Sequence, residues 1–110
     1  MKVRVNQTLL QRDGKPIIDN AGREDAQEAS LRIAIINSLE SILDTDRNEQ
    51  PIKKYERSKL ADKVYAFDEV EFTVEEIAMI KERIGKLFGP YVVKLCWDML
   101  ENKEITPTEN

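Results

Sequence analysis

The chain has 110 residues, of which 35% are charged and 41% hydrophobic, and its formal net charge is −4. This length predicts one domain, and the acidic balance excludes a bulk basic field that would attract nucleic acid. No run approaches the ~20 apolar residues of a membrane span, and MKVRVNQTLL lacks the apolar stretch of a signal peptide. A single cysteine cannot close an internal disulfide, so we expect a cytoplasmic protein.

The N-terminal segment alternates apolar and polar side chains, a pattern typical of a half-buried strand. Val3 and Val5 fall on one side of this strand. The pair Asp13-Gly14 then favours a tight turn, because glycine accepts a positive φ. Residues 2–18 therefore predict a β-hairpin.

Helical spacing of apolar residues predicts four helices beyond the hairpin, at residues 24–43, at 51–67, from the Thr73 cap to Gly89, and at 91–101. In the third helix, Thr73-Val74-Glu75-Glu76 has the form of a capping box. The inward-facing positions are predicted to be Leu31, Ala34, Ile35, Leu39, Ile42, Leu43, Ile52, Leu60, Val64, Phe67, Val74, Ile77, Ile80, Ile84, Leu87, Phe88, Val92, Val93, Leu95, Cys96, Met99 and Leu100.

Residues 69–72 alternate again and predict a third short strand beside the hairpin. The expected fold is therefore α+β and mainly helical, with an N-terminal β-hairpin and this third strand followed by about four α-helices. Residues 1–101 form the single expected domain, and residues 102–110 form a flexible polar tail.

Catalytic chemistry has little support in this sequence. Cys96, the only cysteine, falls mid-helix on an apolar face, which favours core packing over a nucleophile. The chain has no histidine, which removes the commonest general base and excludes an ordinary structural zinc site. A calcium loop starting at Asp44 would need Gly and Glu where Glu49 and Tyr55 stand. We expect no enzyme activity, no cofactor and no metal.

Two surfaces are candidates for binding. Ile33 and Met79 fall off the apolar stripes of their helices, and Trp97 lies at the flank of the last one, so these three are predicted protein-binding anchors. The alternative is that packed layers bury both sides of each helix. Gly85 could admit the close approach of another backbone, or be a tolerated helix glycine. The second candidate surface is a basic helix face for nucleic acid, formed by Lys53, Lys54, Arg57, Lys59 and Lys63.

The segments DGKPI, KKYERSKLADKVY and VEFTVEEIAMIKERIGKLFGPYVVKLCWDMLE resemble small accessory proteins of tailed bacteriophages and prophages. This resemblance implies a viral accessory role in the host cytoplasm, as an assembly chaperone or as an inhibitor or adaptor of a host protein. It carries no catalytic motif. We therefore expect a non-enzymatic protein that binds a host or viral protein, with self-association into a homo-oligomer and nucleic-acid regulation by the basic helix as alternatives.

Overall fold

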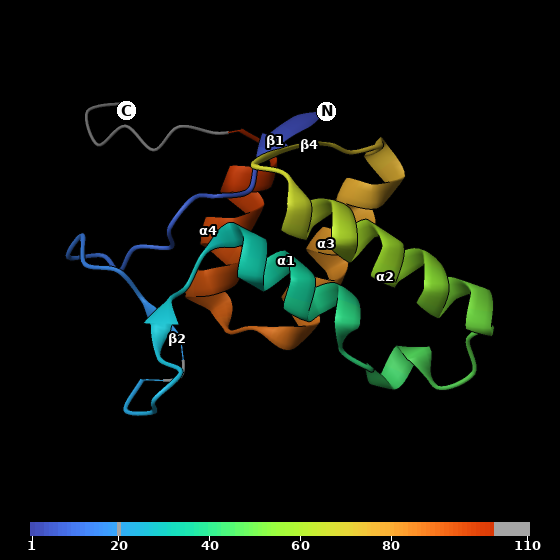
Figure 1. The fold of residues 1–110 in the computed structure, drawn as a ribbon, viewed down its shortest axis with the longest axis horizontal. Coiled ribbons are helices and arrows are strands. Elements are labelled where there is room, and N and C mark those ends of the chain that lie inside the picture. Colours follow the sequence, from blue (N-terminus) through green and yellow to red (C-terminus); the bar gives the residue numbers. More distant parts are fainter. Residues whose placement is uncertain (20, 103–110) are drawn as a thin grey trace.

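The computed structural model describes residues 1–19 and 21–102, so the predicted tail lies outside the described residues from residue 103 onward (Figure 1). The described residues form two small antiparallel sheets and four α-helices, which confirms the expected α+β, mainly helical class. In chain order the elements are β1 (Lys2–Arg4), β2 (Ile18–Asp19), β3 (Gln27–Glu28), α1 (Leu31–Glu40), the 3₁₀ helix η1 (Asp44–Asp46), α2 (Pro51–Ala66), β4 (Glu69–Glu71), α3 (Val74–Leu87) and α4 (Pro90–Leu100).

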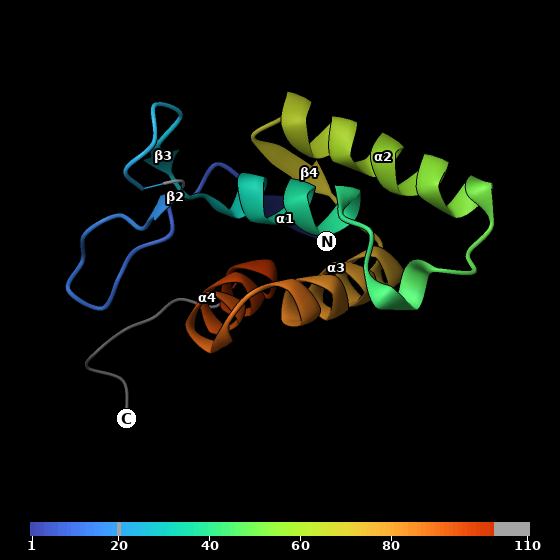
Figure 2. The ribbon, with the colours of Figure 1, turned by 90° about the horizontal axis from the view of Figure 1, so that it is seen from below.

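Helix α1 is the centre of the fold. It lies between α2 on one side and α3 with α4 on the other (Figure 2). Leu31, Ile35 and Leu39 are almost fully buried along one line of this helix, while Ala34 and Ser38 are buried beside them. A ten-residue helix is marginal in isolation. Its packing on both sides supplies the burial that keeps it folded.

The N-terminal strand closes the domain by a long-range pairing. β1 runs antiparallel to β4 and places Val3 opposite Val70, and both valines are buried. The N–H of Phe72 donates to the Met1 carbonyl at 2.9 Å, and the N-terminal ammonium pairs with the Glu71 carboxylate. The predicted third strand is therefore present, and it is the direct partner of the first strand.

The predicted hairpin over residues 2–18 is wrong in its strand pairing. The turn itself forms, with Gly14 at φ 86° and the Gln11 N–H donating to the Lys15 carbonyl at 2.7 Å. Across it, Leu10 and Pro16 form an isolated bridge and the Ile17 N–H donates to the Leu9 carbonyl at 2.9 Å, but this pairing does not extend to β1. β1 pairs with β4 instead, and β2 pairs with β3, because these pairings bury Val3 and order the segment that leads into α1.

Helix α1 is shorter than the predicted 24–43 helix. Residues 27–28 belong to β3, and Ser30 caps the helix by accepting the Ile33 N–H on its Oγ at 3.2 Å. Glu24 therefore lies in the loop between β2 and β3. At the other end, the helix stops at Glu40, so Ile42 is 65% exposed rather than buried.

The boundaries of α2, α3 and α4 follow the predicted signals closely. Pro51 opens α2, the Thr73 capping box opens α3 with both reciprocal hydrogen bonds formed, and α4 begins at Pro90. Besides Ile42, four residues predicted to face inward are exposed, namely Ile52, Phe67, Val74 and Leu87. They lie within two residues of a helix end, where the neighbouring elements no longer cover the side chain.

Candidate functional site

Cys96 is a core residue, as predicted. Its side chain is fully buried on α4, within the same core cluster as Leu95 and Leu100. Burial raises the pKa of the Cys96 thiol to about 12. At neutral pH the group therefore stays a thiol, and a thiol is the unreactive form of cysteine.

Ile33 lies in a small apolar pocket. The pocket has a volume of about 190 Å³ and sits where α1 meets the β2–β3 segment and the turn between α3 and α4. Ile33 is half-buried, yet among the described residues it belongs neither to the core nor to the apolar residues packed on it. The lining consists of Leu9, Ile17, Ile18, Asp19, Ala29, Ser30, Ile33, Ala34, Asn37, Phe88 and Val92.

Met79 lines a different and larger cavity, a groove of about 460 Å³ between α2 and α3. The side chain is partly buried and packs on the edge of the core. The groove is lined by Asp46, Glu49, Lys53, Glu56, Arg57, Leu60, Glu75, Glu76, Met79 and Arg83. Met79 and Ile33 therefore do not share one pocket.

Trp97, the third predicted anchor, lies over α3. Its Nε1 donates to the Lys81 carbonyl at 3.1 Å, and the Lys81 ammonium lies 5.2 Å from the centre of its ring. A Cβ added to Gly85 would meet the Trp97 ring at 3.7 Å, an ordinary contact distance. The indole ring of Trp97 therefore packs against Gly85 within the same chain, and Trp97 remains 38% exposed.

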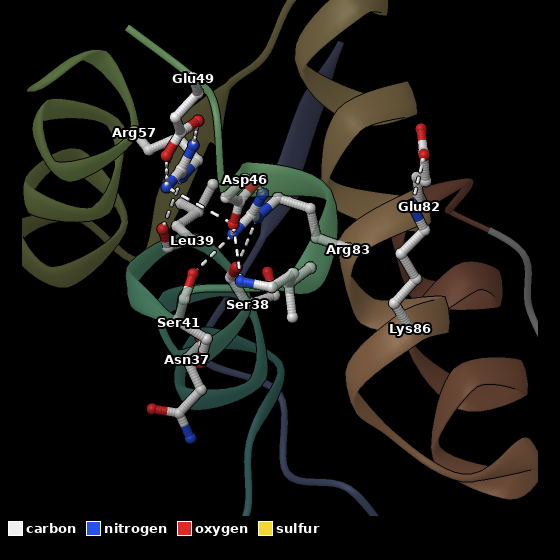
Figure 3. A network of polar contacts seen from close by, with 11 residues as sticks. Asn37, Ser38, Leu39, Ser41, Asp46, Glu49, Arg57, Glu82, Arg83 and Lys86 are labelled. Atoms are coloured by element: carbon white, nitrogen blue, oxygen red, sulfur yellow. Dashed lines mark hydrogen bonds and ion pairs between the residues drawn. The ribbon is translucent and has the colours of Figure 1, made fainter. Parts of the chain in front are cut away.

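A buried polar network forms the deep end of the α2–α3 groove, and Arg83 is its centre (Figure 3). Its Nη1 and Nη2 each bind one oxygen of Asp46 at 2.9 Å. The same guanidinium donates to the carbonyls of Ser38 at 2.6 Å and Ser41 at 2.7 Å. Carbonyls at the end of a helix have no partner within the helix. Arg83, from α3, supplies one for α1.

Arg57 repeats this arrangement from α2. Its Nε donates to the Leu39 carbonyl at 3.0 Å, and its two terminal nitrogens bind both oxygens of Glu49. The Nη2 of Arg57 also lies 3.8 Å from the Oδ2 of Asp46. Two arginines from two helices thus hold the C-terminal end of α1 and the acidic loop that follows it, each in a bidentate pair with a carboxylate.

The network determines the charge state of its carboxylates. Hydrogen bonds from Arg83 lower the pKa of Asp46 from 3.8 to about 2, against the opposing effect of burial. The hydrogen bonds that Arg57 donates to Glu49 lower the pKa of Glu49 and raise the pKa of Arg57. All three groups are therefore charged at neutral pH.

The pKa of Asp46 predicts a loss of stability in acid. Because this pKa is lower in the folded chain than in the unfolded chain, the carboxylate stabilises the fold fully above about pH 4, and the contribution disappears as the pH falls to about 2. A shift of this size corresponds to roughly 2 kcal/mol in the free energy of unfolding. Urea unfolding between pH 2 and 7 should show this slope, and Asp46→Asn should flatten it. Parallel pH profiles of the two proteins would contradict the prediction.

The predicted basic helix face is divided in the structure. Arg57 is buried with its guanidinium committed to Glu49, so it is not available to a phosphate. Lys63 donates to the Glu71 carbonyl at 3.2 Å, and Lys59 lies 5.4 Å from the centre of the Tyr55 ring. Of the remaining two, Lys53 lines the α2–α3 groove and Lys54 is exposed.

No family model, curated protein or solved structure matches this chain. Within residues 1–19 and 21–102, no group of three or more Cys, Asp or Glu side chains is placed to hold a metal ion. In the same part of the chain, no helix is long and apolar enough to cross a membrane.

Sequence reasoning missed the network entirely. Arg83 occupies an apolar face between Ile80 and Ile84, and all three side chains are buried. An arginine at a position that the helical period predicts to be buried signals a paired charge, because such residues are almost never buried alone. The sequence contains no comparable signal for its partner Asp46.

Proposed function

We propose that this protein is a non-enzymatic protein-binding protein, acting as an inhibitor or adaptor of a host protein or as an assembly chaperone. The observation that carries the proposal is the apolar pocket at Ile33. Its volume of about 190 Å³ is below the roughly 300–1,000 Å³ of small-molecule sites, and suits one apolar side chain of a partner. A phage-type accessory role is part of the same proposal, and rests on the sequence resemblance.

Several features of the pocket support a role in binding. Ile18, on its rim, is 45% exposed, so apolar surface continues from the pocket to solvent. Ile33 is half-buried and, among the described residues, belongs neither to the core cluster nor to the apolar residues packed on it, so its side chain is available to a partner. Hot spots of protein interfaces lie in well-packed pockets from which water is excluded. Asn37 and Ser30 supply polar groups beside it.

Substitution at Ile33 tests this proposal. Ile33→Glu should weaken binding to the partner by about 30-fold or more, the effect of losing a hot spot of ~2 kcal/mol. The measurement is affinity purification from a bacterial lysate with immobilised wild-type and variant protein, followed by titration of the partner so identified. Light scattering of the purified chain detects self-association as the other form of partner.

Ile42→Glu is the matched control, because Ile42 is 65% exposed and lies outside the pocket. It makes the same chemical change at an equally apolar residue. A partner retained by wild-type and Ile42→Glu but lost by a folded Ile33→Glu would support the proposal. Equal binding by both variants, or the absence of both a partner and an oligomer, would contradict it.

A further inference from the structure

The groove between α2 and α3 has a small apolar part, in which Leu60 is buried and Met79 stays partly exposed. α1 packs against both helices, and α2 and α3 lie on opposite sides of it (Figure 2). Side chains of α2 and α3 line the groove. Leu60 from α2 and Met79 from α3 form its apolar part, and Met79 is only partly buried. Methionine adapts to ligands of different shape, because its side chain is flexible and polarizable.

The charges in the groove do not balance. At its deep end, Asp46 and Glu49 are compensated by Arg83 and Arg57. The charged side chains left on the rim are Glu56 and Lys53 from α2 and Glu75 and Glu76 from α3. Three carboxylates therefore face one ammonium.

Two of the rim carboxylates are free to bind a cation. Glu76 uses its carboxylate to accept the Thr73 N–H at 2.8 Å within the capping box. Glu56 and Glu75 are exposed, and neither of their carboxylates forms an ion pair or hydrogen bond with the described part of the chain. They stand on opposite walls of the groove, one on each helix.

We propose that this groove receives a lysine or arginine side chain of the partner protein. The aliphatic stem of such a side chain would pack on Met79 beside the buried Leu60, while its charged end would lie between Glu56 and Glu75. A purely apolar side chain would leave the rim charge uncompensated, and an acidic one would be repelled. This second contact rests on the proposed protein-binding function but uses residues distinct from the Ile33 pocket.

The probe for this site is a capped alanine-rich peptide with one central lysine, compared with a twin that carries norleucine at that position. Binding to the ¹⁵N- and methyl-labelled full chain is followed by nuclear magnetic resonance. The lysine peptide should shift the Met79 methyl and the groove amides, with an affinity that falls as salt is raised. Glu56→Gln/Glu75→Gln should weaken it about five-fold.

The control Glu24→Gln/Glu28→Gln removes the same charge from exposed residues outside the groove, and should leave the affinity unchanged. Ile33→Glu should also leave it unchanged, so a failure of the pocket and a failure of the groove give different results. Equal binding of the norleucine twin, no shift in the groove, or full affinity in Glu56→Gln/Glu75→Gln would overturn the proposal. So would n-butylamine binding as tightly as the peptide, because the site would then take a free amine.

Discussion

Replacement of Arg83 by alanine should lower the free energy of unfolding by about 3–5 kcal/mol, the cost of breaking a buried ion pair by removing one partner. The variant leaves Asp46 buried beside Arg57 with two of its hydrogen bonds gone, and leaves the Ser38 and Ser41 carbonyls without their donor. A domain of this kind has about 5–15 kcal/mol of stability in total. Urea unfolding at pH 7 measures the loss.

Lys86→Ala is the matched control for this prediction. Lys86 lies one turn further along α3 and pairs with Glu82 on the exposed face, pointing away from the network (Figure 3). Exposed pairs of this type contribute little, so the control should stay within about 0.5 kcal/mol of wild type. A similar small loss in Arg83→Ala would show that the network is not needed for stability.

A double variant separates the ion pair from the packing around it. Arg83→Met with Asp46→Asn removes both charges and keeps similar side-chain volumes. In the double variant neither charge is left buried alone. Its loss in the free energy of unfolding should therefore be smaller than the summed losses of Arg83→Met and Asp46→Asn, by about 0.5–3 kcal/mol. Strict additivity would contradict the close pairing seen in the structure.

Replacement of Phe72 by alanine should cost about 3–5 kcal/mol, the usual effect of removing a large aromatic side chain from a core. Phe72 is 1% exposed and directly follows β4, where its N–H binds the Met1 carbonyl. The cavity would therefore open at the junction of the N-terminal strand, β4 and the start of α3. Thermal or urea unfolding of the purified variant measures the effect.

Phe67→Ala makes the same change five residues earlier and should alter stability by about 0.5 kcal/mol or less. Its side chain is 59% exposed, and its role in the fold is through its backbone. The Phe67 carbonyl accepts Arg32 Nη2 at 3.1 Å, and its N–H donates to the Lys63 carbonyl, both of which alanine retains. Equal losses in the two variants would contradict the burial that distinguishes these phenylalanines.

The sequence by itself determined the parts of the fold that depend on neighbours a few residues away. Pro51 favours the first turn of a helix, and the Thr73 box satisfies the backbone donors of its own helix, so both starts were predicted correctly. The packing of Cys96 followed from the apolar face of one helix. Each of these features needs only the local backbone and a period of about 3.6 residues.

The tertiary structure alone decided which distant groups meet. Arg83 and Asp46 are 37 residues apart, and Lys2 and Glu71 of the paired strands are separated by 69. The start of α1 depended on the pairing of β3 with β2, which places residues 27–28 of the predicted helix in a strand. The separate pockets of Ile33 and Met79 are lined by different sets of elements, which only the packed chain brings together. Such contacts form only when the whole chain closes, and periodicity within one segment carries no record of them.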